Sequence, residues 1–213
     1  MRRFFAYMLA PFTRLYRFIR EIRYLASILE AHSIARRMFV TNAFDSLLST
    51  LGIVLGLYVA RIDNPLSYVS AVAGGVGLMG VFSGFIATYL SERSERLREL
   101  HETERVMLHD LRGSIYWRAA HLVPLYVALW SATGAILLPM LSITPLVLEL
   151  IAGARINEVG VYASVSIILI EMFLLGFYLG RISGENPLLS GARFLVIGLA
   201  ATGVMLLLRI VSG

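Results

Sequence analysis

Two acidic residues stand inside long apolar stretches of the chain. Asp45 belongs to "NAFDSLLSTLG", residues 42–52, and Glu171 belongs to "SIILIEMFLLG", residues 166–176. An ionised side chain in the middle of a membrane helix costs about 2.5–3.5 kcal/mol on insertion scales, so it usually faces a partner or a water-filled path. Both acids are therefore candidates for an ion or proton pathway.

Polar and small residues surround Asp45 at helical spacing. Asn42 lies three residues before it and Ser49 four residues after it, and Gly52 extends the same face. We expect this face to line a pathway or a tight interface. The alternative is a structural aspartate that caps or hydrogen-bonds a neighbouring backbone.

Two methionines accompany the acids. Met172 follows Glu171 directly, and Met79 lies in the second long apolar stretch. Carboxylate oxygens combined with a thioether suit a transition-metal ion better than calcium or magnesium. Asp45 and Met79 are therefore candidate metal ligands. Methionine is also ordinary apolar filler, and two carboxylates could relay protons instead.

Further candidates lie in the charged segment that follows the second apolar stretch. Four glutamates step by three, four and three residues, which places them on one face of a helix: Glu92, Glu95, Glu99 and Glu102. Such a face could collect divalent cations, and Glu95, Glu99 and Glu102 are taken as metal candidates. Arginines interleave with them at ion-pair spacing, so a solvated, salt-bridged helix is the alternative.

The composition predicts the environment of these residues. Of the 213 residues, 58% are hydrophobic, against roughly 45–50% in soluble domains, so we expect an integral membrane protein. The absence of cysteine excludes thiolate metal sites, and the absence of lysine among the 19 basic residues excludes Schiff-base chemistry. No hydrolase, metalloprotease or nucleotide-binding motif occurs, so no enzyme is predicted. The basic excess is attributed to membrane orientation rather than to nucleic acid.

Five apolar stretches have the length that crosses a bilayer, about 20 residues each. We therefore predict an all-α, polytopic fold with a transmembrane domain over residues 38–213. The five stretches are residues 38–60, 68–90, 120–141, 159–180 and 193–211. A charged helix is expected between the second and the third, at about residues 91–118.

The distribution of arginine predicts the orientation of these helices. Only Arg61, Arg155 and Arg209 fall outside the N-terminal segment and the second and fourth connections. Because arginine is enriched in cytoplasmic loops, the N-terminus and the charged helix are expected in the cytoplasm and the C-terminus outside.

The N-terminal segment, residues 1–37, repeats apolar residues at helical spacing between arginines. We expect a basic amphipathic helix that lies among the headgroups of anionic lipid rather than a cleaved signal peptide. A helix packed on the rest of the protein is the alternative.

Small residues predict close helix packing. The second apolar stretch carries them at steps of three and four: Ala73, Gly77, Gly80, Gly84, Ala87 and Ser91. Backbones can approach closely along such a stripe, which favours a compact bundle and a homodimer.

These segments together resemble the vacuolar iron transporter family of iron and manganese transporters and their nodulin-like relatives. "NAFDSLLSTLGIVLG" looks like the first membrane helix of the family and "GVFSGFIATYLSERSE" like the end of its second. "ATGAILLPML" is similar to the proline-bearing third helix. "FLLGFYLGRISGENPLLSGARFLVIGLAATGVMLLLRIVSG" resembles the fourth and fifth helices. The chain departs from the family in the second helix, where Gly84 stands in place of a methionine and an acid is missing, and in its short cytoplasmic connection.

The resemblance implies a five-helix homodimer that exports cytosolic ferrous iron, and often manganese, in exchange for protons. Asp45 matches the acid of the family's first helix, which helps to carry the ion and the proton. Glu95 matches the glutamate at the exit of the second helix. Glu99 and Glu102 fall near the helix that collects metal in the cytoplasm.

We therefore expect a transporter that moves Fe²⁺ or Mn²⁺ out of the cytosol by proton antiport, with no tightly bound cofactor. Asn42, Asp45, Ser49 and Glu171 are the expected ion and proton pathway. The expected location is the cell membrane of a prokaryote or an organelle membrane, such as the vacuolar membrane, of a eukaryote. The alternatives are a carrier for another solute on the same scaffold and a non-transporting membrane scaffold or sensor.

Overall fold

The structure is a computed structural model that describes residues 20, 21, 24, 25, 27 and 31–212. The interfacial helix expected over residues 1–37 therefore lies mostly outside the described residues. All regular secondary structure in the described part is helical, as predicted.

Five helices are long and apolar enough to cross a membrane, which confirms the predicted number within the described part of the chain. They are α2 (Ala31–Val59), the continuous helix Pro65–Met107, α5 (Ile115–Ser142), α7 (Glu158–Ser183) and α8 (Pro187–Ser212). The short helix α6 (Thr144–Ile151) connects α5 to α7. The first crossing begins at Ala31 rather than at the expected residue 38.

Side-chain caps and proline fix where the helices begin. The continuous second helix starts at Pro65, whose ring suits the first helical position, and the side chain of Asn64 accepts a hydrogen bond from the backbone of Leu66. Ser114 caps α5 in the same way, and Asn157 caps α7. The tight turn predicted from Asn64-Pro65 is thus present.

The charged segment differs from the prediction of one helix over residues 91–118. Helix α4 (Thr88–Met107) continues the second crossing without interruption and ends where Leu108 adopts a left-handed conformation with φ of 49°. Gly113, with φ of 77°, completes the reversal before α5 starts at Ile115. Leu108 is an unusual residue for this conformation, so sequence periodicity did not reveal the break.

The middle of the second crossing is π-helical. The second crossing consists of helix α3 (Pro65–Ala71), the π-helices η1 (Val72–Gly77) and η2 (Gly80–Ala87), and α4. A π-helix bonds each N–H to a carbonyl five residues earlier, is rare, and is frequent at functional sites. The Thr88 hydroxyl also donates to the carbonyl of Ser83, five residues earlier, at 3.2 Å.

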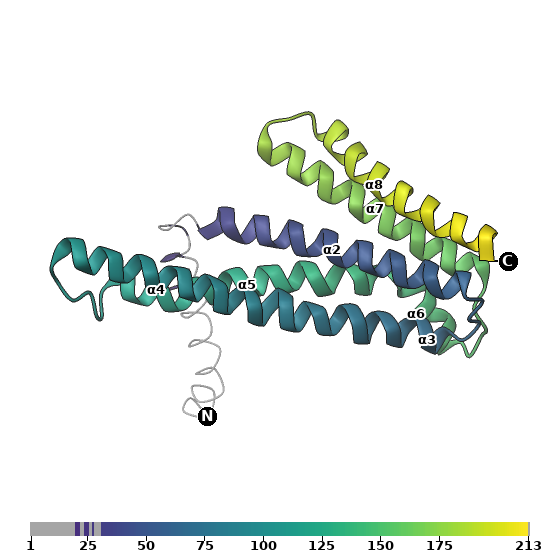
Figure 1. The fold of residues 1–213 in the computed structure, drawn as a ribbon, viewed down its shortest axis with the longest axis horizontal. Coiled ribbons are helices and arrows are strands. Elements are labelled where there is room, and N and C mark those ends of the chain that lie inside the picture. The colour runs from purple at the N-terminus through teal and green to yellow at the C-terminus, as the bar shows by residue number, and fades with distance from the viewer. Residues whose placement is uncertain (1–19, 22–23, 26, 28–30, 213) are drawn as a thin grey trace, which may run out of the picture.

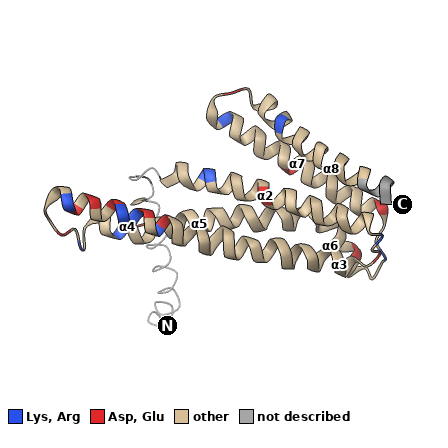
Figure 2. Cartoon of the chain, viewed as in Figure 1, with Lys and Arg blue, Asp and Glu red and all other residues tan. Residues whose placement is uncertain are grey.

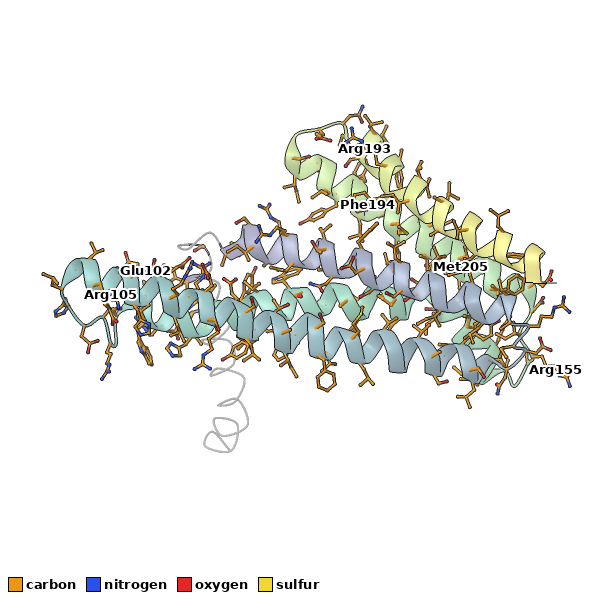
Figure 3. The ribbon with its side chains drawn as sticks, in the orientation of Figure 1. Glu102, Arg105, Arg155, Arg193, Phe194 and Met205 are labelled. Carbon is orange, nitrogen blue, oxygen red and sulfur yellow. The ribbon has the colours of Figure 1, made fainter. Side chains whose placement is uncertain are left out.

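Close packing at small residues holds the crossings together. A Cβ on Gly84 would lie 3.3 Å from the Cα of Ala132 in α5, and one on Gly176 would lie 2.7 Å from the carbonyl oxygen of Ser190 in α8. Part of the predicted small-residue stripe therefore packs inside one chain. Helix α8 also packs on α2, where the rings of Phe44 and Phe194 lie 4.9 Å apart (Figure 3).

The bundle has two chemically different ends. The start of α2, the tip of the α4–α5 hairpin and the α7–α8 turn lie at one end, which we call the arginine-rich end, and α6 lies at the other (Figure 1). The charged residues gather on α4 and in the connections, and the helices between are mostly uncharged (Figure 2). Toward the arginine-rich end the α7–α8 hairpin diverges from α2 and α5 (Figure 1).

Candidate functional site

Asp45 lies midway along α2, about 21 Å from either end of the helix at 1.5 Å per residue. Its side chain is exposed on the single chain, and within the described residues it makes no hydrogen bond or ion pair. The hydroxyl of Ser49 donates to the Asp45 carbonyl oxygen at 2.8 Å. Thr41, one turn earlier, is exposed too. We call Thr41, Asp45 and Ser49 the α2 stripe.

Asn42 takes part in a hydrogen-bond network that joins three helices. Its side-chain amide donates to the hydroxyl of Ser131 in α5 at 2.9 Å and to the carbonyl of Met38 at 3.0 Å. Ser131 is fully buried, and its hydroxyl lies 3.2 Å from that of Thr88 in α4. The network fixes α2 and α5 against the π-helical part of the second crossing.

A small polar groove lies between α2 and the second crossing. It has a volume of about 230 Å³, and we call it the α2–η2 groove. Its lining consists mostly of short or polar side chains: Met38, Asn42, Ser83, Ala87, Thr88, Ser91 and Glu92. Polar atoms of this kind can hydrate or bind a small ion, whereas lipid tails gain nothing from them.

The residues that line the groove lie at different depths along the bundle. Because α2 and the second crossing run antiparallel, Glu92 lies nearest the arginine-rich end and Ser83 lies deeper. Asp45 is three residues beyond Asn42 in the deeper direction, about 4.5 Å along the helix. Met79 lies four residues beyond Ser83 in the same direction and is 37% exposed. Asp45 and Met79 thus both lie deeper along the bundle than the groove, and neither belongs to its lining.

The glutamates of α4 have arginine partners. Arg96 pairs with Glu92 and with Glu99, each at 2.9 Å, and Arg98 pairs with Glu95. Arg98 also lies 4.0 Å from Glu102. Glu102 is on the part of α4 that extends, beside α5, past α2, α7 and α8 (Figure 3). These contacts are the ones expected of a salt-bridged helix, and the collection of metal by Glu95, Glu99 and Glu102 stays a prediction.

Glu171 occupies a different site from Asp45. It is 9% exposed and accepts a hydrogen bond of 2.5 Å from the Ser142 hydroxyl. It lines a cavity of about 540 Å³ between α2, α5 and α7, and Asp45 is not part of that lining. Met172, next in sequence, is completely buried in the core. The structure therefore does not bring the two acids of the expected pathway together within one chain.

Metal ligands are sparse in a single chain. Among the residues that the structure describes, no three His, Asp or Glu side chains lie close enough together to hold a metal ion. Asp45 can supply one carboxylate, and water, hydroxyl groups or a second copy of the chain would have to supply the rest.

Three features of the site were not expected from the sequence. Ser131 and Thr88 are single hydroxyls in apolar stretches, and only their partners in other helices show that they belong with Asn42. The position of Glu92 in the groove depends on helix packing. Ser131 falls in "LWSATG", so a polar residue within an apolar stretch was the available signal.

Comparisons with known proteins give one distant relative. The chain is 26% identical over 172 residues to an uncharacterized protein of Methanocaldococcus jannaschii, and the alignment covers 79% of this chain and 85% of that protein. No protein-family model and no solved structure matches the chain. The similarity extends over most of both proteins and carries no statement about function.

Proposed function

We propose that the protein is a transporter that exports a divalent transition metal, Fe²⁺ or Mn²⁺, from the cytosol in exchange for protons. The observation that carries the proposal is the α2 stripe. It holds a carboxylate within the first apolar helix, three residues from Asn42 of the α2–η2 groove, without an ion partner in the described part of its own chain.

The exposed position of Asp45 supports a homodimer. A carboxylate that faces lipid at the centre of a helix costs about 2.5–3.5 kcal/mol, and this cost disappears if a second protein surface covers the stripe. In a twofold dimer the same patch meets itself, so two copies of Asp45 would approach one another across the axis. Two carboxylates and nearby hydroxyls form a better cation site than one carboxylate alone.

The direction of transport follows from the arginine distribution. The positive-inside rule assigns the arginine-rich end, and with it the N-terminus, to the cytosol, and the C-terminus to the opposite side. A cation would then enter the α2–η2 groove beside Glu92 and pass Asn42 to reach Asp45. Met79 lies beyond this point, where a thioether would favour a transition metal over magnesium.

Proton exchange follows from the chemistry of a carboxylate. Asp45 can hold either a metal ion or a proton, and the two compete for the same oxygens. Release of the metal on the acidic side of the membrane would protonate Asp45, and return of the empty site to the cytosol would release that proton. Glu171 could relay protons separately, since it lies in another cavity.

The proposal can be tested in liposomes that contain a dye quenched by iron and a pH indicator. Wild-type protein should carry Fe²⁺ and Mn²⁺ and move protons in the opposite direction. Asp45→Asn should lower the metal flux at least about tenfold, because loss of an anionic ligand costs roughly 1.4 kcal/mol or more. Glu185→Gln removes an exposed acid that pairs with Arg193, and it should leave the flux unchanged.

A non-transporting scaffold is the second candidate, and the Asn42 network favours it, since that network locks three helices together. For a scaffold, neither metal nor protons would cross the liposome membrane, and Asp45→Asn would change thermal stability alone. A carrier for another solute would be recognised by proton flux that iron and manganese do not stimulate.

A further inference from the structure

The cavity that contains Glu171 has the dimensions of a site for a small molecule. Its volume of about 540 Å³ falls within the range of roughly 300–1,000 Å³ typical of ligand pockets. It lies between α2, α5 and α7, and we call it the α2–α7 cleft. Six residues define its chemistry: His32, Arg36, Phe39, Tyr126, Trp130 and Glu171.

The cleft is elongated, and its two ends differ. At the arginine-rich end, Nδ1 of His32 lies 2.7 Å from the Tyr126 hydroxyl. At the deep end are Leu138 and Glu171. Tyr126 and Leu138 are twelve residues apart on α5, which corresponds to about 18 Å. A ligand that fills the cleft is therefore longer than it is wide and meets a carboxyl group at its inner end.

Glu171 has no cationic partner within the described residues. It is 9% exposed, and the Ser142 hydroxyl is its one hydrogen-bond donor there. Arg36 lines the same cleft, but the two form no ion pair among the described residues. A buried carboxyl group without a countercharge is a site where a cation gains most.

Aromatic rings form the walls between these ends. The Trp130 ring lies 6.0 Å from Phe39 at an interplanar angle of 79°, and 6.4 Å from Tyr126 at 72°. These edge-to-face contacts fix the orientation of the Trp130 ring, and the faces of aromatic rings attract cationic and aromatic groups. Trp130 is 45% exposed and lies near the middle of α5. This position is unusual, because tryptophan in membrane helices is enriched at the membrane–water interfaces.

The cleft is open along the side of the bundle. Leu174 and Tyr178 of α7 belong to its lining and are 55% and 40% exposed. The α7–α8 hairpin diverges from α2 on this side (Figure 1). A hydrophobic molecule could thus enter from the lipid, whereas Arg36 repels small hydrated cations at the aqueous end.

From these observations we infer that the α2–α7 cleft binds a lipophilic organic monocation, with the cationic group at Glu171 and an aromatic or apolar body between Phe39, Tyr126 and Trp130. This inference does not depend on the proposed metal transport, since Asp45 lies outside the cleft. It adds an organic ligand, bound near Glu171, to a protein in which Asp45 is suited to a small inorganic ion.

A matched pair of dyes tests the inference. One is a dimethylaminostyryl-N-methylpyridinium, an elongated permanent cation. The other is its parent pyridine, which lacks the N-methyl group and is uncharged in alkaline buffer. The full chain is used in detergent with Trp117→Phe, so that Trp130 is the sole tryptophan and its quenching reports occupancy of the cleft. Thermal melting of each variant confirms folding.

We expect the cation to quench Trp130 with an affinity at least about tenfold higher than that of the neutral parent. Glu171→Gln keeps the shape of the side chain and should abolish this preference, while Asp45→Asn should preserve it. Arg36→Ala should not weaken binding of the cation. If Glu171→Gln does not fold, Ser142→Ala provides the comparison, because it leaves Glu171 without its one hydrogen-bond donor among the described residues and should weaken the preference for the cation.

Other results would overturn the inference. Equal affinity for the two dyes would show an apolar crevice without charge selectivity. Tighter binding of an elongated anionic dye, lost in Arg36→Ala and kept in Glu171→Gln, would identify a site for anionic amphiphiles. Loss of cation binding in Asp45→Asn but not in Glu171→Gln would place the cation at the α2 stripe instead.

Discussion

The surroundings of Asp45 and of Glu171 differ in almost every respect except the carboxyl group. Asp45 is exposed on one chain between Thr41 and Ser49, and Asn42, three residues earlier, lines the α2–η2 groove. Glu171 is buried, with one hydroxyl partner and aromatic walls nearby. The comparison teaches that a membrane acid cannot be assigned a role from its residue type alone, because the side chains around it determine which cation the site would suit.

The largest effect is expected from a substitution that blocks the α2–η2 groove and leaves the α2–α7 cleft unchanged. Ser83→Phe places a phenyl ring in the α2–η2 groove, whose volume is about 230 Å³. We expect metal flux in liposomes to fall at least about tenfold, since an obstructed groove cannot hold the hydrated ion. Binding of the cationic dye to the α2–α7 cleft should not change. Phe82→Trp alters the neighbouring residue, which is 61% exposed, and serves as the control.

The dimer predicted for the α2 stripe can be tested by cysteine cross-linking, because the chain has no cysteine of its own. Thr41→Cys should form a disulfide-linked dimer in membranes under mild oxidation, as the stripe meets its symmetry mate. Leu199→Cys, an exposed position on α8, should stay monomeric. The opposite pattern would place the interface on α8 and leave Asp45 facing lipid.

Packing of α2 on α5 supports both regions, and one glycine tests it. A Cβ on Gly134 would lie 2.6 Å from the carbonyl oxygen of Phe39, so Gly134→Ala must push the two backbones apart. We expect the protein to lose about 1–3 kcal/mol of stability. A Cβ on Gly77 would meet nothing within 4 Å, and Gly77→Ala should leave the melting temperature nearly unchanged. Equal melting temperatures for the two variants would contradict the close contact.

Five crossings could be predicted from the sequence, because about 20 apolar residues span a bilayer. Helical periodicity placed Asn42 on one face with Asp45, whereas the Asn42 side chain bonds to Ser131 of α5 and Asp45 is exposed. The π-helical segments could not be predicted, since periodicity does not distinguish hydrogen bonds over four residues from those over five. The α2–α7 cleft could not either, because it arises where the α7–α8 hairpin diverges from α2. The end of α4 could not be predicted, because it depends on the left-handed backbone conformation of Leu108, which leucine rarely adopts.

The smallest effect concerns the network around Asn42. Ser131→Ala removes the hydroxyl that joins Asn42 to Thr88. Interhelical hydrogen bonds in membranes contribute about 0.6 kcal/mol on average, so we expect a small decrease in stability and a smaller decrease in metal flux. Thr133→Ala is a suitable control, because the one bond of its hydroxyl within the described residues is to the carbonyl of Leu129 in the same helix. A decrease in stability in the control alone would show that the Asn42 network does not stabilise the protein.

The central claim is that Asp45 carries the metal. The most direct test is the simultaneous measurement of Fe²⁺ and proton flux in liposomes with wild-type protein and with Asp45→Asn. The account predicts that wild type moves iron one way and protons the other, and that Asp45→Asn loses both fluxes while it still folds and binds the cationic dye. Transport of iron by Asp45→Asn at the wild-type rate would contradict the account.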